Sequence, residues 1–249
     1  MRLDLSHRGD FPLSSVVVHQ DATELLRSLS RGSVQVVITD PAYESLEKHR
    51  TGSEKCRRLR NWFPIFHNNR YPDFFKAAYR AMAKNSHLYI MCDEETADVV
   101  KPIGVAAGFK YWKACVWDRV MRGTGYHYAN THEFVLFFEK GKMQLNDRKH
   151  ISIVRGIQSV RGGKPAHKDG MRQLGDAYPT EKPVELYRYF IENSALPGDL
   201  VVDPFCGSGN SALAALSLGC DYIGGDVSKA AVLETKHRVD LYHRYLNEA

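Results

Sequence analysis

The chain has 249 residues, 43% hydrophobic and 25% charged, with a formal net charge of +5. This composition supports a buried core and excludes a wholly disordered chain, and the length fits one large domain or one domain with an insert. No apolar run approaches the roughly 20 residues of a membrane-spanning helix, and residues 1–10 lack the apolar stretch of a signal peptide. We therefore expect a cytoplasmic protein (nucleoid-associated in a prokaryote) with no membrane partner.

The cysteines and histidines show no pattern of a metal site or a disulfide framework. The five cysteines lie far apart without a Cys-x-x-Cys pair, and the eleven histidines are scattered as well. Structural zinc sites need clustered ligands, and disulfide frameworks need paired cysteines in a short secreted chain. The sequence therefore predicts reduced thiols and no bound metal.

The positive charge is concentrated in two segments. Residues 141–180 hold eight Lys and Arg against three Asp, and residues 44–70 hold seven against three Glu. The rest of the chain is therefore net acidic. Two basic segments on an acidic body favour a polyanionic partner bound at defined places, the alternative being a pair of solvated loops.

The predicted elements alternate between strand and helix. In chain order, strands are expected at residues 15–19, 34–39, 88–92, 110–117, 133–138, 199–203 and 221–226. Helices are expected at residues 22–29, 73–82, 94–107, 183–192, 211–218 and 229–246. Between residues 141 and 178 the apolar periodicity fades and glycines interrupt the chain, as in an inserted surface module. The alternation elsewhere predicts a largely parallel sheet covered by helices.

A glycine turn joins two of the C-terminal elements. Residues 203–212 read Asp-Pro-Phe-Cys-Gly-Ser-Gly-Asn-Ser-Ala, and the glycines at 207 and 209 let the backbone approach a ligand closely. Asp226, at the end of the next strand, is placed to accept hydrogen bonds from ribose hydroxyls. A dinucleotide cofactor stays open at this point. Asp203, however, would repel a pyrophosphate and attract the ammonium group of S-adenosylmethionine.

Carboxylates follow four of the predicted strands. They are Asp21, Asp40, Asp203 and Asp226. If these strands are parallel neighbours, the acids meet at one rim of the sheet, where open α/β sheets bind their ligands. The alternatives are that Asp21 only caps its helix and that Asp40 only opens a proline turn.

Three motifs carry a resemblance to a known family. Asp-Pro-Ala-Tyr at 40–43 resembles the Asp-Pro-Pro-Tyr motif of amino-group DNA methyltransferases, and residues 203–209 resemble their S-adenosylmethionine motif. Thr-Glu-Lys-Pro-Val-Glu-Leu at 180–186 resembles their Lys-Pro-x-Glu-Leu element. The order of the motifs over residues 15–245 is similar to the permuted β class. Ala42 replaces the second proline, which loosens the turn by about 0.4–1 kcal/mol.

The resemblance implies an α/β fold with a Rossmann-like, mostly parallel sheet of seven strands, helices on both faces and a circularly permuted motif order. It implies one methyltransferase domain in three parts. Residues 1–140 form the catalytic half, which includes the basic loop 44–70. Residues 141–178 form a target-recognition insert, and residues 179–249 form the cofactor-binding half.

The resemblance also implies a site-specific enzyme of DNA methylation and restriction-modification systems that methylates an exocyclic amine of a flipped base in double-stranded DNA. Asp at the first motif position favours adenine N6. The carboxylate of Asp40 and the carbonyl of Pro41 would accept the amine hydrogens, and Tyr43 would stack on the base. The family pattern places these residues around S-adenosylmethionine: Asp21, Ala22, Asp40, Lys182, Pro183, Asp203, Phe205, Gly207, Gly209 and Asp226.

Basic residues of the two positive segments are the candidates for DNA contact. They are Arg57, Arg58, Arg60, Arg148, Lys149, Arg155, Arg161, Lys164, Lys168 and Arg172. Among the nearby aromatic residues Trp62, Phe63 and Phe66, one would fill the space left by the flipped base, unless they pack as a hydrophobic loop.

Three alternatives stay open on the sequence: cytosine N4 as the methylated atom, a nicotinamide-dependent oxidoreductase, and a catalytically silent nucleic-acid-binding module. The sequence does not determine the recognition site, a partner nuclease or a homodimer.

Overall fold

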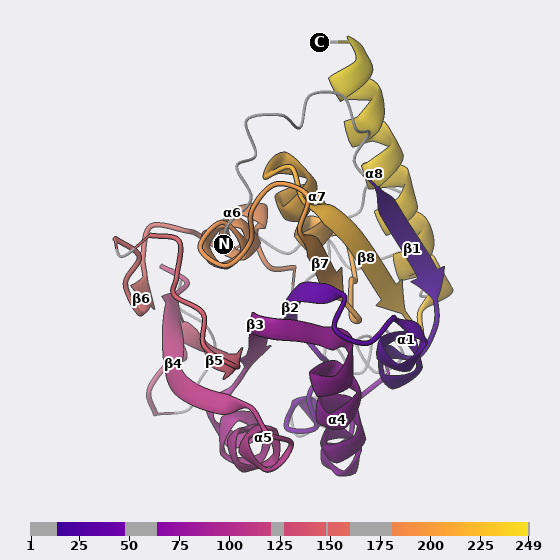
Figure 1. Ribbon diagram of the computed structural model, residues 1–249. Coiled ribbons are helices and arrows are strands. Elements are labelled where there is room, and N and C mark those ends of the chain that lie inside the picture. Colours follow the sequence, from indigo (N-terminus) through magenta and orange to yellow (C-terminus); the bar gives the residue numbers. More distant parts are fainter. Residues whose placement is uncertain (1–13, 48–63, 121–126, 148, 160–180, 249) are drawn as a thin grey trace.

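The computed structural model describes residues 14–47, 64–120, 127–147, 149–159 and 181–248. Within them an eight-stranded sheet runs in the order β1-β8-β7-β2-β3-β5-β4-β6, with helices on both faces (Figure 1). The predicted α/β fold is confirmed, but the sheet has eight strands where seven were expected. The extra strand, β6 (Ile153–Val154), comes from the insert and pairs with β4. Two residues are too short to give a periodic signal in the sequence.

Five adjacent strands form the parallel part of the sheet: β1 (Ser15–His19), β8 (Asp221–Asp226), β7 (Leu200–Asp203), β2 (Val34–Thr39) and β3 (Met82–Cys92). The strand β5 (His132–Lys140) then runs antiparallel between β3 and β4 (Lys110–Asp118). The sheet is therefore parallel where the cofactor motif lies and mixed on the other side of β2.

Each face of the sheet is covered by a different set of helices. One face carries α6 (Val184–Ile191), α7 (Asn210–Ser217) and α8 (Lys229–Glu248). The other carries α1 (Ala22–Ser28), α4 (Tyr71–Ala81), which follows the short 3₁₀ helix η1 (Asn68–Arg70), and α5 (Glu94–Ala106). Alternate residues of β2 enter the two cores, Val36 and Ile38 on one face and Val37 on the other. Burial on both faces explains the continuous apolar run of this strand.

The chain leaves β7 and β2 in opposite directions. From β7 it continues through α7 to β8, and from β2 through α4 to β3, although β7 and β2 are neighbours. Such a switch point opens a crevice at the carboxyl ends of the strands. The four carboxylates predicted to share one rim follow or end the adjacent parallel strands β1, β8, β7 and β2. That prediction is confirmed.

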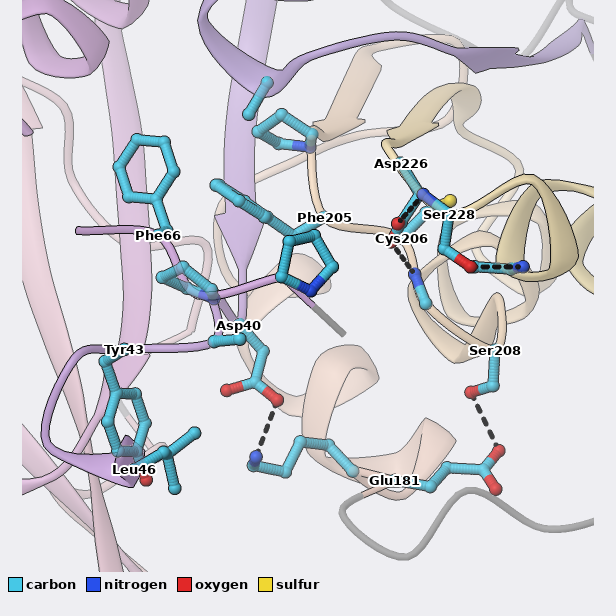
Figure 2. A pocket seen from close by; sticks show the side chains of 18 of the residues that line it. Asp40, Tyr43, Leu46, Phe66, Glu181, Phe205, Cys206, Ser208, Asp226 and Ser228 are labelled. Atoms are coloured by element: carbon cyan, nitrogen blue, oxygen red, sulfur yellow. Dashed lines mark hydrogen bonds and ion pairs between the residues drawn. The ribbon is translucent and has the colours of Figure 1, made fainter. Parts of the chain in front are cut away.

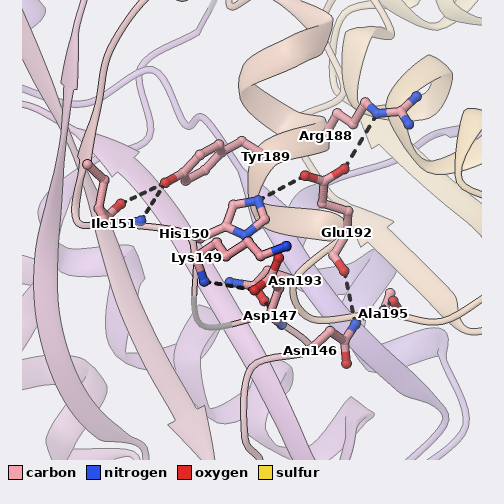
Figure 3. Close-up of polar contacts among 10 residues, drawn as sticks. All are labelled: Asn146, Asp147, Lys149, His150, Ile151, Arg188, Tyr189, Glu192, Asn193 and Ala195. Carbon is pink, nitrogen blue, oxygen red and sulfur yellow. Dashed lines mark hydrogen bonds and ion pairs between the residues drawn. The ribbon is translucent and has the colours of Figure 1, made fainter.

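The described part of the insert packs against α6 (Figure 3). Asn146 Nδ2 donates to the carbonyls of Glu192 and Ala195, both at 2.9 Å, and the Ile151 amide donates to the Tyr189 hydroxyl at 2.8 Å. Val154 is buried in the core below. Residues 160–178 lie outside the described residues, and the division into three parts stays a prediction. In the described ranges no helix is long and apolar enough to cross a membrane.

Candidate active site

A pocket of about 470 Å³ lies at the switch point, within the size range of small-molecule sites. Its walls come from the turn after β2, the glycine turn after β7, the end of β8 and the start of α1. In Figure 2, Asp40 lies between Tyr43 and Leu46 on one side and Cys206 and Asp226 on the other. The two turns that carry the sequence motifs therefore face one common space.

The turn after β2 is held in place by a distant backbone segment. Tyr43 forms an isolated parallel bridge with Phe66, and the Phe66 amide donates to the Ala42 carbonyl at 2.7 Å. The residue that replaces the second proline thus has a backbone hydrogen bond that fixes its orientation. Asp40, Pro41 and Tyr43 all line the pocket, as predicted for the catalytic motif.

Asp40 forms an ion pair with Lys182, whose Nζ lies 2.6 Å from Asp40 Oδ2. The same ammonium group lies 3.1 Å from Glu133 Oε2. Burial raises the pKa of Asp40, and the positive charge of Lys182 opposes that rise. Burial acts to lower the pKa of Lys182, but the charges of Asp40 and Glu133 outweigh it, so the lysine is held in its ammonium form.

The glycine turn is tied to the end of β8 through Asp226. The Gly207 amide donates to Asp226 Oδ2 at 3.1 Å, and the Ser228 amide donates to Oδ1 at 2.8 Å. Gly207 has a φ of +51°, in the left-handed region that favours glycine. Burial raises the pKa of the Asp226 carboxyl, and the two amides oppose that rise. Gly207 and Asp226 both line the pocket.

Asp21 and Phe205 form a further part of the wall. Asp21 caps α1 through the Thr23 amide at 3.0 Å, and Arg70 donates to its other oxygen at 2.5 Å. Partial burial acts to raise the pKa of Asp21, but these bonds hold it below its ordinary value. The Phe205 ring packs edge-on against Phe66, with centroids 5.0 Å apart. Each of these two residues therefore has a structural contact and also lines the pocket, as does Ala22, while their contact with a cofactor stays a prediction.

Three predicted cofactor residues do not line the pocket. Asp203 is fully buried, and its Oδ1 accepts from the Thr39 hydroxyl at 2.7 Å and the Phe205 amide at 3.0 Å. Gly209 is the N-cap of α7, and Pro183 is the N-cap of α6. Direct contact of these three with a cofactor stays a prediction.

Sequence reasoning missed several pocket residues. Glu181 accepts from Ser208 at 2.9 Å and from Arg238 at 3.0 Å, and so binds the glycine turn to α8. Its position next to the Lys-Pro motif was a usable signal. Glu133 and Arg119 carried no signal, because they lie on or beside antiparallel strands and reach the pocket only through the tertiary fold.

The side chains of the pocket fit a cationic nucleoside better than a pyrophosphate. Among the described residues its three basic side chains, Arg70, Arg119 and Lys182, are each paired with a carboxylate, so none of them is left to bind a phosphate. Carboxylates from three strand ends and the apolar faces of Phe205 and Val227 complete the wall. This donor set matches S-adenosylmethionine, which carries a positive charge and no phosphate. Fold and pocket together are typical of a Rossmann-like site for a cationic nucleoside.

Only two of the predicted DNA-contacting residues can be placed. Lys149 and Arg155 are both exposed. The others lie outside the described residues: Arg57, Arg58, Arg60, Arg148, Arg161, Lys164, Lys168 and Arg172. Phe66 is 2% exposed and packs in the core, so the packing interpretation holds for this aromatic, while Trp62 and Phe63 lie outside the described residues. Among the described residues no group of three His, Cys, Asp or Glu could hold a metal ion.

Comparison with known proteins gives the family. Residues 34–237 match the N6_N4_Mtase family, described as DNA methylase. The Type II methyltransferase M.HpaI of Haemophilus parainfluenzae is 25% identical over 237 residues, covering 90% of this chain and 74% of that protein. The DNA adenine methyltransferase YhdJ of Escherichia coli is 23% identical over 259 residues, covering 94% and 86%.

Solved structures share the fold. TTHA0409 of Thermus thermophilus, a putative DNA modification methylase complexed with S-adenosyl-L-methionine, superposes with a TM-score of 0.66 at 17% identity, covering 92% of this chain and 94% of that one. The PvuII DNA methyltransferase (cytosine-N4-specific) gives 0.65 at 15% identity, covering 94% and 93%.

The chain belongs to this family of DNA methylases, which confirms the resemblance to amino-group DNA methyltransferases, while the permuted β class stays a prediction. It is an enzyme of DNA methylation, with S-adenosylmethionine as methyl donor. The alternative of a nicotinamide-dependent oxidoreductase is wrong. The Gly-x-Gly-x-x-Ala pattern that suggested it is common to both kinds of nucleoside site.

Proposed function

We propose that the protein is a site-specific DNA methyltransferase that methylates N6 of an adenine flipped out of double-stranded DNA. The observation that carries the proposal is the position of Asp40, which lines the same pocket as the glycine turn. In Figure 2 the Asp40 carboxylate lies in the space between Tyr43 and Leu46 on one side and Cys206 and Asp226 on the other. It can therefore hold an amine next to a methyl donor.

The residues of the turn supply the catalytic groups. Lys182 contacts Oδ2 of Asp40, so we assign Oδ1 to one amine hydrogen, and the Pro41 carbonyl would accept the other, as the family resemblance implies. Two acceptors pull the nitrogen toward tetrahedral geometry and stabilise the positive charge that develops on it. S-adenosylmethionine, when bound, supplies an electrophilic methyl group. As the nitrogen–methyl bond forms, the sulfur–methyl bond breaks, and the nitrogen then releases one proton.

Adenine is favoured over cytosine by the first residue of the motif and by a named relative. Asp40 occupies the position at which the resemblance favours adenine, and YhdJ is a DNA adenine methyltransferase. The fold by itself does not choose, because the PvuII enzyme, which is cytosine-N4-specific, shares it. Cytosine N4 is therefore the second candidate.

The test is methyl transfer to a DNA duplex library from labelled S-adenosylmethionine, followed by digestion to nucleosides and mass spectrometry. We expect N6-methyladenine. N4-methylcytosine would overturn the base assignment, and no incorporation would overturn the activity. Asp40→Ala should lower the single-turnover rate at least about 100-fold, because it removes an acceptor aimed at developing charge. Calorimetry with S-adenosylhomocysteine should show affinity within about threefold of the wild type.

We also infer that residues 141–178 read the target sequence and that the enzyme acts in the cytoplasm, where its DNA substrate lies. The exposed side chains of Lys149 and Arg155 support the first inference, since they lie on the described part of this segment. Sedimentation of the protein with and without duplex DNA would show whether two copies pair as a homodimer on the site.

A further inference from the structure

Four charged side chains from different parts of the fold line the pocket and are connected by ion pairs. Asp40 Oδ2 lies 2.6 Å from Lys182 Nζ, which lies 3.1 Å from Glu133 Oε2. The other carboxylate oxygen of Glu133, Oε1, lies 3.1 Å from Arg119 Nη1. The side chains of Lys182, Glu133 and Asp40 are only 7%, 13% and 19% exposed. Negative and positive groups therefore alternate in surroundings that screen charge weakly.

We propose that Glu133 and Lys182 are positioning residues for the methyl transfer, which together fix the orientation and the net charge of the catalytic carboxylate Asp40. The proposal rests on the proposed function and adds to it two residues that act through Asp40. Glu133 comes from β5, on the antiparallel side of the sheet, and Lys182 from the segment before α6. Neither belongs to the motif that contains Asp40.

The charge balance explains why two carboxylates share one lysine. A pair of Asp40 and Lys182 alone would be neutral, and it would attract the positive charge on the reacting nitrogen only weakly. With Glu133 and Arg119 added, the four groups are again neutral overall. Glu133, however, lies against the same ammonium group, so Lys182 neutralises Asp40 less completely and leaves more negative charge on it. Arg119 lies beyond Glu133 and is held in turn by the Asn130 carbonyl at 3.1 Å, so it orients Glu133 from the side away from Lys182.

The geometry also explains the orientation of Asp40. A carboxylate has two oxygens, and the reaction needs one of them free to face the amine. Lys182 binds Oδ2, and the backbone of Lys182 is fixed because its carbonyl accepts from Asn210 Nδ2 at 2.6 Å. A bond from a fixed lysine therefore determines which oxygen of Asp40 points into the pocket.

Asp40 is surrounded by titratable groups on every element packed against it. They are Lys182 before α6, Glu133 on β5, Tyr43 on its own turn, Tyr71 on α4, Cys92 on β3, Tyr187 on α6 and Asp203 on β7. Burial raises the pKa of the tyrosines and of Cys92, so these groups stay neutral at physiological pH. The charges that act on Asp40 are thus chiefly those of Lys182 and Glu133, with opposite signs.

The test compares the isosteric variant Glu133→Gln with Lys182→Met. In protein labelled with carbon-13 at the aspartate carboxyls, the Asp40 signal is assigned by its loss in Asp40→Asn, and its titration is followed by NMR. The pKa of Asp40 should fall in Glu133→Gln, because a like charge is removed. It should rise in Lys182→Met, because an opposite charge is removed. Shifts in opposite directions are not expected from a general loosening of the pocket.

Kinetics supply the second measurement. In single-turnover methyl transfer with DNA bound, Glu133→Gln should be about 10- to 100-fold slower, the size of effect expected when a reacting group is misplaced. The affinities for S-adenosylhomocysteine and for DNA should stay within about threefold. The matched control is Glu139→Gln, which changes a buried glutamate of the same strand that bonds Trp112 and Met143 and has no contact with Asp40. It should leave the Asp40 pKa and the rate unchanged.

Three results would overturn the proposal: an Asp40 pKa that does not move in Glu133→Gln, shifts in the same direction in both variants, or a Glu133→Gln defect seen only as weaker DNA binding. A defect of this last kind would mean that Glu133 contacts the target base of the DNA and does not act through Asp40. If Lys182→Met does not fold, the double variant with Glu133→Gln leaves Asp40 without either of these two charged neighbours, and its burial should still raise the Asp40 pKa. The titration can be measured without turnover. If the wild-type protein transfers no methyl group, that result counts against the proposed function and not against the effect of Glu133 and Lys182 on Asp40.

Discussion

At the scale of single residues, the pocket shows how burial changes what one carboxyl group does. Asp40, Asp203 and Asp226 all follow or end neighbouring parallel strands. Asp226 accepts hydrogen bonds from two backbone amides, and Asp40 accepts one from an ammonium group. Asp203 is fully buried and accepts hydrogen bonds from one hydroxyl and one backbone amide. Burial raises the pKa of Asp203 to about 7, and its hydrogen bonds oppose that rise. The same residue type thus lines the pocket in one turn and is buried behind it in the next.

Asp203 should make stability depend on pH. Its pKa in the folded protein is about 7, above the value of about 3.9 expected in the unfolded chain. Between these values the folded state holds a proton that the unfolded state has lost, so this group's stabilising contribution falls as pH rises, by up to about 1.4 kcal/mol per pH unit. Urea unfolding from pH 4 to 9 should show the wild type losing stability relative to Asp203→Asn up to about pH 7, with no further divergence above pH 8. Parallel curves would contradict the assignment.

At the scale of elements, the start of α7 joins the glycine turn to α8. Gly209 caps α7 with a φ of +87°, and its α-carbon faces Thr235 of α8. The Thr235 hydroxyl donates to the Gly207 carbonyl at 3.1 Å, and Arg238 donates to the Ser208 carbonyl at 2.8 Å. The C-terminal helix therefore supports the turn from behind. This contact requires a glycine for both conformation and space.

Replacing Gly209 with alanine should cost more stability than replacing a glycine of similar conformation in open space. A β-carbon at 209 would lie 2.9 Å from Thr235 Cγ2 and 3.1 Å from its Cα, so overpacking adds to the backbone strain. We expect Gly209→Ala to lower the free energy of unfolding by about 2–4 kcal/mol. The control is Gly32→Ala, with a φ of +72° and no atom within 4 Å, which should lose about 1–2 kcal/mol. If urea unfolding shows equal losses of stability in Gly209→Ala and Gly32→Ala, the added β-carbon is accommodated by a shift of Thr235 and overpacking costs nothing.

At the scale of the whole molecule, the distribution of charge bears on how DNA is held. The described basic side chains of the pocket are each paired with a carboxylate. The phosphates of DNA are therefore expected to contact basic residues outside the pocket. The segment 149–159 crosses the edge of the sheet at β6 and exposes Lys149 and Arg155. Lys149 and Arg155 do not line the pocket, so these two described basic residues are separate from the paired cations there.

Phosphate contacts by Lys149 and Arg155 should appear in the salt dependence of DNA binding. Each phosphate neutralised contributes about 0.9 to the slope of log affinity against log salt. The double alanine variant of these residues should therefore lower the slope by up to about 1.8. The matched control replaces Lys236 and Arg244, two exposed basic residues of α8, and should leave the slope unchanged. If the slope falls equally in the two double variants, DNA binding depends on the overall charge of the protein and not on contacts by Lys149 and Arg155.

The sequence by itself determined the elements other than β6, the parallel rim and the motifs. Periodicity and caps are local properties, so residues such as Asp21 and the apolar run of β2 could be interpreted without neighbours. The position of Asp40 and the glycine turn on one pocket followed from the rule that parallel strands bring their carboxyl ends to one edge.

Only the tertiary structure decided what surrounds Asp40. Glu133 lies 93 positions from it and Lys182 142 positions, and no local pattern marks Glu133 or Arg119 as pocket residues. The strand β6 and the buried place of Asp203 likewise depend on packing between distant segments. The physical reason is that burial and electrostatic pairing are set by distances in space, which spacing along the chain does not fix.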